Sequence, residues 1–217
     1  FYARAGMVVL NNGKTGAVTF IGTVSPAGGN LKEPVTESTK KAARCFYALE
    51  QNRADQKRYP AVNPIDSYSK YLEYPEIQEF LDEKIEKGWT ERVNRAKNIV
   101  RQGRDAAEQI NILGDDGVPM NYHETFWKSE LLDFVFLQQD AFDAVDSLCP
   151  LERQKFMLNL ILDICDREFS FEDFEQCRNF FKELINDLRQ MNYSQFHSEA
   201  FEKYNSELSK LLEENGK

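Results

Sequence analysis

The segment formed by residues 59–74, YPAVNPIDSYSKYLEY, divides the chain into two parts of different character. Its two prolines disfavour helical geometry at and before their own positions, so no helix can run through the segment. The residues before it predict strands and turns with one helix, whereas the residues after it predict helix almost throughout. The segment also carries four tyrosines, Tyr59, Tyr68, Tyr71 and Tyr74. Such a rigid aromatic junction either packs the joint between two lobes or forms a wall for a flat ligand.

The net charge of −9 is distributed unevenly along the chain. Residues 1–72 contain 10 Lys and Arg against 5 Asp and Glu, whereas residues 73–217 contain 17 against 31. The acidic second part argues against nucleic acid as a partner, and the mildly basic first part is compatible with a phosphorylated ligand. No stretch approaches the ~18 consecutive apolar residues of a membrane span, so we expect none.

The cysteines and histidines predict neither a disulfide framework nor a metal site. Four cysteines, Cys45, Cys149, Cys165 and Cys177, show no C-x-x-C spacing and stand in largely apolar, helical surroundings. This pattern favours reduced, buried thiols of a cytosolic protein. The two histidines, His123 and His197, are far apart in the sequence, and we therefore expect no metal site built on a histidine cluster.

The first part of the chain predicts a hairpin and then a helix. Residues 7–10 and 17–24 are two apolar runs around an Asn-Gly turn, which is typical of a β-hairpin. The triplet Gly13-Lys14-Thr15 is not a phosphate-binding loop, because that motif needs a glycine where Val8 stands. After a loop rich in proline and glycine, a helix is expected to start near Thr36. Its residues facing the core would be Ala42, Ala43, Cys45, Phe46 and Leu49.

Beyond the junction the apolar spacing predicts six helices. The first three cover about residues 75–85, 90–112 and 124–139, with an acidic turn at residues 114–119 between the second and third. Pro150 opens the fourth, and Ser170 with Asp173 predicts a capping box at the start of the fifth. The sixth helix contains Phe201, Tyr204, Leu208 and Leu211. We expect the last two helices to form an antiparallel hairpin whose aromatic residues pack the core.

Several segments in series carry a resemblance to a known family. They are residues 4–6 (RAG), 24–36 (VSPAGGNLKEPVT), 46–49 (FYAL), 59–63 (YPAVN), 67–69 (SYS), 136–143 (FLQQDAFD) and 145–149 (VDSLC). In this order they resemble the catalytic A (alpha) subunit of V-type and archaeal-type rotary ATPases. The resemblance extends from residue 1 to about residue 165, and residues 166–217 are a less diagnostic helical extension.

The resemblance implies an α/β fold followed by an all-α part. Residues 1–74 would be the last strands and helix of a RecA-like nucleotide-binding domain, and residues 75–217 the C-terminal helical bundle domain. The chain begins with neither a signal peptide nor Met, so we expect it to come from within a longer protein. The family's phosphate-binding loop, magnesium-binding acidic residue and catalytic glutamate would precede it. We therefore expect no catalytic residue and no metal site in these residues, and no ATP hydrolysis by this chain alone.

The resemblance also implies an adenine pocket. The aromatic ring of Tyr59 would stack on the base, Phe142 would close the pocket, and Gln138 and Gln139 would be its polar neighbours. Stacking an aromatic side chain on a base contributes ~1–3 kcal/mol. The family usually has Phe where Tyr59 stands, which keeps the ring. At Lys70 the noncatalytic B subunit carries an arginine, and this difference favours the A subunit.

The resemblance further implies partners, cofactors and a location. The subunit would alternate with noncatalytic B subunits in an A3B3 ring, contact the central stalk rotor through a turn at Asp115 and Asp116, and bind ATP or ADP with magnesium. The complex would lie on the cytoplasmic face of a membrane and translocate protons or sodium ions. The alternative is a helical scaffold or interaction module with a small β-rich cap and no ligand. Only the first hypothesis has a reason to bring Tyr59 and Phe142 together in space.

Overall fold

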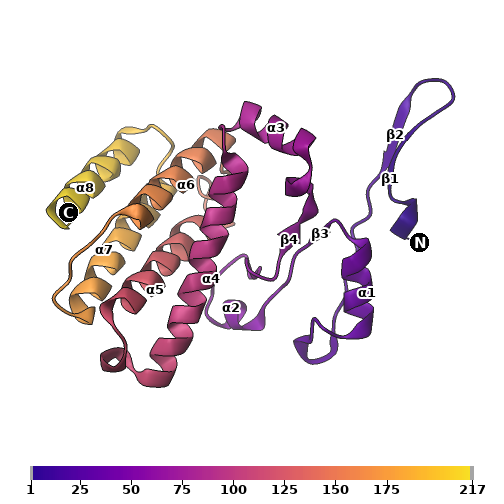
Figure 1. The fold of residues 1–217 in the computed structure, drawn as a ribbon. Coiled ribbons are helices and arrows are strands. Elements are labelled where there is room, and N and C mark those ends of the chain that lie inside the picture. The colour runs from indigo at the N-terminus through magenta and orange to yellow at the C-terminus, as the bar shows by residue number, and fades with distance from the viewer. Residues whose placement is uncertain (1, 216–217) are drawn as a thin grey trace.

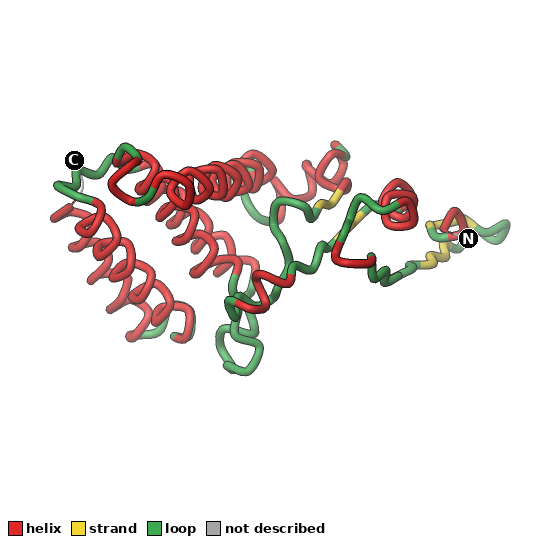
Figure 2. Tube along the Cα trace, turned by 90° about the horizontal axis from the view of Figure 1, so that it is seen from below, coloured by secondary structure: helices red, strands yellow, loops and turns green. Residues whose placement is uncertain are grey.

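The structure is a computed structural model that describes residues 2–215. A short stretch of strands and turns leads into a bundle of helices, and the hairpin at one end lies far from the last helix at the other (Figure 1). The view from below shows the same separation (Figure 2). This arrangement confirms the expected order of a small α/β part followed by an all-α part.

The chain begins with a short 3₁₀ turn, η1 (Tyr2–Arg4), and an antiparallel hairpin of β1 (Gly6–Val9) and β2 (Thr15–Val18). Gly13 adopts a φ of 78° at the tip, where the Leu10 N–H donates to the Lys14 carbonyl at 2.8 Å. The Gly-Lys-Thr triplet is thus a hairpin tip, as expected. The second strand ends at Val18 and does not reach residue 24, because β1 pairs with only these four residues.

The helix α1 (Pro34–Ala42) follows a short turn, η2 (Ala27–Gly29). Its N-cap is Glu33, whose carboxylate accepts a hydrogen bond from the Thr36 N–H at 2.8 Å. The expectation that the helix continues to Leu49 was wrong. Cys45 and Phe46 instead form β3 (Cys45–Phe46), which pairs with β4 (Tyr68–Ser69). The local spacing of apolar residues does not reveal pairing with a strand more than twenty residues away in the sequence.

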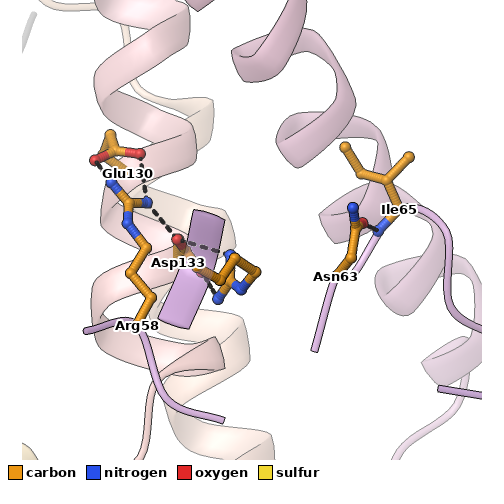
Figure 3. A network of polar contacts seen from close by, with 6 residues as sticks. Arg58, Asn63, Ile65, Glu130 and Asp133 are labelled. Atoms are coloured by element: carbon orange, nitrogen blue, oxygen red, sulfur yellow. Dashed lines mark hydrogen bonds and ion pairs between the residues drawn. The ribbon is translucent and has the colours of Figure 1, made fainter. Parts of the chain in front are cut away.

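The junction between the two parts is an irregular segment with its own hydrogen bonds. After α2 (Gln51–Asp55), Asn63 makes a tight turn in which its Oδ1 accepts from the Ile65 N–H at 2.8 Å (Figure 3). Leu49 forms a β-bridge with Val62, and β4 leads into η3 (Lys70–Glu73). The junction therefore contains no α-helix, as its prolines predict.

The expected six α-helices follow the junction. They are α3 (Pro75–Lys84), α4 (Trp89–Leu113), α5 (Met120–Leu132), α6 (Leu151–Asp166), α7 (Phe174–Tyr193) and α8 (Glu199–Asn215). A short turn η4 (Asp115–Gly117) joins α4 to α5, and α5 runs on into a π-helical turn, η5 (Asp133–Leu137). The cap of α7 differs from the prediction, because Asp173 itself is the N-cap and accepts from the Gln176 N–H.

The main core lies among α5, α6, α7 and α8. Its fully buried side chains include Leu131, Ile161, Ile164, Phe181, Leu184, Leu188, Phe201 and Leu208. The helices α7 and α8 lie side by side as an antiparallel pair, so the prediction that their aromatic residues pack the core is confirmed (Figure 1). Burying an aromatic or aliphatic side chain of this kind contributes ~1.5–3 kcal/mol, which makes this region the principal source of stability.

The four cysteines are free thiols in different environments. Cys177 is fully buried in α7, as expected. Cys149 is exposed, which contradicts the expectation of a buried thiol, because it lies in the loop before α6 and not in a helix. Among residues 2–215 no grouping of three or more His, Cys, Asp or Glu could hold a metal ion.

Candidate functional site

Tyr59 lies at the start of the junction, where its backbone is held by a residue of the loop that follows η5. The Tyr59 carbonyl accepts a hydrogen bond from the Gln139 N–H at 2.9 Å. The Tyr59 hydroxyl donates to the Ala54 carbonyl at 3.3 Å, and the side chain is 54% exposed. The residue is therefore fixed through its main chain while one side of its ring stays accessible.

The π-helical turn η5 places Gln138 and Gln139 next to Tyr59. The Gln138 N–H donates to the Asp133 carbonyl at 2.9 Å, which closes the wide turn and ends the helix. The Gln139 side-chain amide donates to the Asp146 carbonyl at 2.6 Å. In contrast, Nε2 of Gln138 is buried and has no hydrogen-bond partner within the part of the chain that the structure describes.

Phe142 lies on the loop between η5 and α6. The Asp146 carboxylate accepts from the Asp140 N–H at 2.6 Å, and the Asp140 carboxylate accepts from the Phe142 N–H at 2.9 Å. Asp143 accepts from two further backbone N–H groups of the loop, each at 2.8 Å. The loop is thus shaped by its own aspartates, and the Phe142 ring is fully exposed at its tip.

These elements enclose one hollow of about 740 Å³, which we call the Tyr59 hollow. It is lined by Tyr59, Gln138, Gln139, Phe142 and, among others, Lys57 and Asn192. All four residues that the sequence singles out for the adenine pocket therefore line the same space. Tyr59 and Phe142 reach it from positions 83 residues apart in the sequence.

The Tyr59 hollow combines aromatic side chains with polar ones. One aromatic ring is held by its backbone and a second stands at the rim, so a flat ligand can lie against apolar faces. The unpartnered amide of Gln138 can turn a donor or an acceptor toward the edge of a base, and adenine offers both in return. Asp140 and Asp146 also line the hollow, and within the described part of the chain no grouping of three or more His, Cys, Asp or Glu could hold a metal ion.

Behind Tyr59 lies a polar network that the sequence did not predict, consisting of Arg53, Arg58, Glu130 and Asp133 (Figure 3). Both guanidinium Nη atoms of Arg53 donate to the Asp133 carboxylate, at 2.7 and 3.2 Å. Arg58 donates to Glu130 through two hydrogen bonds, at 2.8 and 2.9 Å, and also to Asp133. The network joins α2 and the junction to α5 and η5.

Burial and neighbouring charges shift the pKa of Arg58 in opposite directions. Burial by itself lowers the pKa of the Arg58 guanidinium, but the hydrogen bonds and charges of Glu130 and Asp133 outweigh it, so the pKa is raised. Arg58 therefore stays charged, and its guanidinium also lies 4.7 Å from the centre of the Phe134 ring. The sequence signal for this network is weak: two arginines five residues apart, and two acids three residues apart on one helix face.

Asp115 and Asp116 lie in η4, exposed at the end of the α4–α5 pair. The Asp115 carbonyl forms a hydrogen bond with Nε2 of the buried His123 at 2.9 Å, which ties the turn to α5. Neither aspartate lines the Tyr59 hollow. Asp115 instead borders a separate polar hollow of about 830 Å³, which also includes Arg53 and Arg58.

Two known domain families match the chain. Residues 1–69 match the nucleotide-binding domain of the ATP synthase alpha/beta family, and residues 78–197 match the C-terminal domain of V and A type ATP synthase. The chain belongs to the V and A type ATP synthase family. This membership confirms the resemblance stated above and disfavours an unrelated helical scaffold.

Relatives of this V and A type ATP synthase chain match it almost from end to end. It is 39% identical over 214 residues to the V-type ATP synthase alpha chain of Protochlamydia amoebophila, which is 99% of this chain. It is 40% identical over 213 residues, 98% of this chain, to the V-type ATP synthase alpha chain of Chlamydia caviae. In both cases the chain spans only 36% of the relative's length.

A solved structure supports the fold of this V and A type ATP synthase chain. An ATP synthase subunit, NeqB from Nanoarcheaum equitans, superposes with a TM-score of 0.57 at 18% identity. The superposition covers 77% of this chain and 38% of that one. Within the described residues, no helix is both long and apolar enough to cross a membrane.

Proposed function

We propose that this chain is the C-terminal part of the catalytic A (alpha) subunit of a V-type, ion-translocating rotary ATPase. Residues 1–74 complete the nucleotide-binding domain, and residues 75–217 form the helical domain that couples to the central rotor. The observation that carries the proposal is that Tyr59, Gln138, Gln139 and Phe142 line one hollow. Nothing in helical packing alone requires an aromatic residue of the junction and an aromatic loop tip to share such a space.

In this proposal the chain binds the base of ATP or ADP and leaves phosphoryl transfer to other parts of the subunit. The Tyr59 ring stacks on adenine, Phe142 covers its other side, and the Gln138 amide reads its edge. Phosphoryl transfer needs a phosphate cradle, a metal ion and a positioned base. In this proposal other parts of the subunit supply these groups, so we expect no ATP hydrolysis by the 217-residue chain alone.

The partners that fit this proposal are noncatalytic B subunits, which alternate with this subunit in an A3B3 ring, and the subunits of the central stalk. The turn with Asp115 and Asp116 is the part that would face the rotor, and its exposure at the end of α4 and α5 is compatible with that contact. The complex would lie peripherally on the cytoplasmic face of a membrane and move protons or sodium ions.

The test uses two substitutions of Tyr59 in the full-length subunit within its complex. One removes the aromatic ring, and the other removes only its hydroxyl group. Tyr59→Ala should weaken ATP binding by about five- to 150-fold, because it removes a stacking energy of ~1–3 kcal/mol. Tyr59→Phe should change little, because the ring remains and only the 3.3 Å bond to the Ala54 carbonyl is lost. Affinity for pyrophosphate, which has no base, should stay the same in both variants.

Tyr122→Ala is the matched control, because Tyr122 is an exposed tyrosine of α5 that does not line the Tyr59 hollow. Isothermal titration with ATP and with pyrophosphate gives the affinities. Equal losses for Tyr59→Ala and Tyr59→Phe would mean that the hydroxyl matters and that the stacking role is wrong. Unchanged ATP affinity in Tyr59→Ala would remove the adenine pocket from this hollow.

A further inference from the structure

We infer that Asp133 is a positioning residue for the base-binding hollow, acting through Arg58 on Tyr59 and through its own carbonyl on Gln138. This inference rests on the proposed function. Asp133 is only 4% exposed, and it uses both its side chain and its main chain at this place: the carboxylate accepts from two arginines, and the carbonyl accepts from the Gln138 N–H.

The contacts of Asp133 form a closed ring that reaches the Tyr59 hollow through Tyr59, Gln138 and Gln139. Asp133 and Arg58 themselves border the separate polar hollow. Its carboxylate accepts from Arg58, which is covalently joined to Tyr59. The Tyr59 carbonyl accepts from the Gln139 N–H at 2.9 Å, and Gln139 follows Gln138, whose N–H returns to the Asp133 carbonyl at 2.9 Å. Asp133 is therefore linked to the backbones of Tyr59 and Gln138 from two directions, and in this inference that linkage sets the spacing between the Tyr59 ring and the Gln138 amide.

The π-helical turn makes this closed ring of contacts possible. An α-helical turn would pair the carbonyl of Asp133 with the residue four positions on, whereas here it pairs with Gln138, five positions on. The wider turn moves Gln138 and Gln139 out of the helix and toward the junction. Such single π turns in α-helices are frequent at functional sites.

Asp133 contributes more than its neighbour Glu130 to the charge balance of the polar network. Arg58 has two acidic partners, Glu130 and Asp133, whereas the hydrogen bonds of Arg53 go to Asp133 alone. Arg53 is 9% exposed, and its Nε has no partner among the described residues. Without the Asp133 carboxylate, Arg53 would be a buried charge without a counter-charge. We expect the segment from α2 to the junction, which carries Arg53, to move away from η5 as a result.

The experiment uses Asp133→Asn in the full-length subunit within its complex, with ATP and pyrophosphate as probes. Loss of the negative charge should weaken ATP binding by about tenfold, because the ring and the amide lose their spacing. Pyrophosphate affinity and kcat at saturating ATP should stay unchanged, since neither depends on the base. Glu124→Gln is the matched control, because it makes the same chemical change on α5 at an acid that pairs with Lys128 within the helix.

A double substitution separates positioning from general loss of structure. In a Tyr59→Ala background, Asp133→Asn should weaken ATP binding less than it does in the parent, because the Tyr59 ring is gone and only the Gln138 amide remains to be positioned. Additive losses, or equal weakening of ATP and pyrophosphate, would overturn the inference. If Asp133→Asn does not fold, Arg58→Lys tests the same closed ring of contacts. Lysine keeps the charge but cannot bridge two carboxylates through a planar fork. Arg58→Lys should therefore show the same ATP-specific loss.

The outcome also distinguishes this inference from the proposed function. If Tyr59→Ala weakens ATP binding while Asp133→Asn and Arg58→Lys leave it unchanged, the pocket stands and the positioning role fails. If Tyr59→Ala itself has no effect on ATP affinity, the base-binding hollow fails, and the role of Asp133 fails with it.

Discussion

Gly103 of α4 lies directly against Ser129 of α5, so closely that a Cβ atom on Gly103 would come within 2.0 Å of the Ser129 Cβ. Gly103 lies near the middle of α4, Ser129 lies in the last turn of α5, and both are buried. The close approach lets the two helix backbones pack together, which brings the acidic turn at one end and η5 at the other into their places.

Gly103→Ala should therefore destabilise the protein even though alanine is the better helix former. The added methyl group must push the helices apart, and overpacking of this kind costs about 1–3 kcal/mol. The free energy of unfolding from a urea titration measures the loss. In the double variant Gly103→Ala with Ser129→Gly, most of the stability should return, because the atoms in conflict are the Cβ and Oγ of Ser129. No recovery would mean that the helices are not this close.

Asn192→Ala should destabilise the end of α5. The Asn192 side-chain amide donates to the Val135 carbonyl at 2.6 Å, and the Asn192 carbonyl accepts from the buried Arg153. Removing the amide leaves a carbonyl of the π turn without its partner, which costs about 1–3 kcal/mol. Thermal unfolding followed by circular dichroism measures it. The exposed Asn98 offers the control: Asn98→Ala should stay within about 0.5 kcal/mol of the parent.

The stability of the protein should depend on pH through Asp146. Burial raises the pKa of the Asp146 carboxyl, and the hydrogen bond from the Asp140 N–H lowers it only in part. The folded state therefore binds this proton more tightly than the unfolded state does. The cost of burying the charge appears as the pH rises through the raised pKa, and it is absent below the ordinary value of about 3.9.

Asp146→Asn should accordingly raise the melting temperature at pH 7, and the gain should shrink as the pH falls to about 3. Melting curves at a series of pH values provide the measurement. Asp116→Asn, at an exposed turn, controls for the loss of one negative charge from an acidic protein. A gain that grows toward low pH would have the wrong sign and would contradict the burial argument.

The four thiols should differ in reactivity in the native state. Burial raises the pKa of Cys165 and of Cys177 to about 12 in each case, so at pH 8 almost no thiolate is present at either. Cys149 is exposed, although burial of its thiol still raises its pKa. Iodoacetamide should modify Cys149 well before Cys165 or Cys177, as followed by mass spectrometry. In denaturant all four should react, and equally rapid native labelling of Cys177 would contradict its burial.

The sequence alone determined the six α-helices of the second part of the chain. Helical periodicity is a local property, and residues such as Phe181, Leu184 and Leu188 repeat at the spacing that one buried face requires. The two prolines of the junction are equally local, since each restricts its own backbone and that of the residue before it. The sequence alone also indicated the aromatic residues of the candidate site, because the motifs around Tyr59 and Phe142 resemble those of the family.

Only the tertiary structure decided which distant residues meet. Cys45 and Phe46 leave the predicted helix because a strand more than twenty residues away offers them backbone hydrogen bonds. Arg53 and Asp133 are 80 positions apart, and nothing in the local pattern of either shows that their charges are buried together. The π turn at Asp133 likewise depends on Asn192 and on the junction. Buried charges and wide turns persist because of partners contributed by other elements, and those partners are chosen by packing.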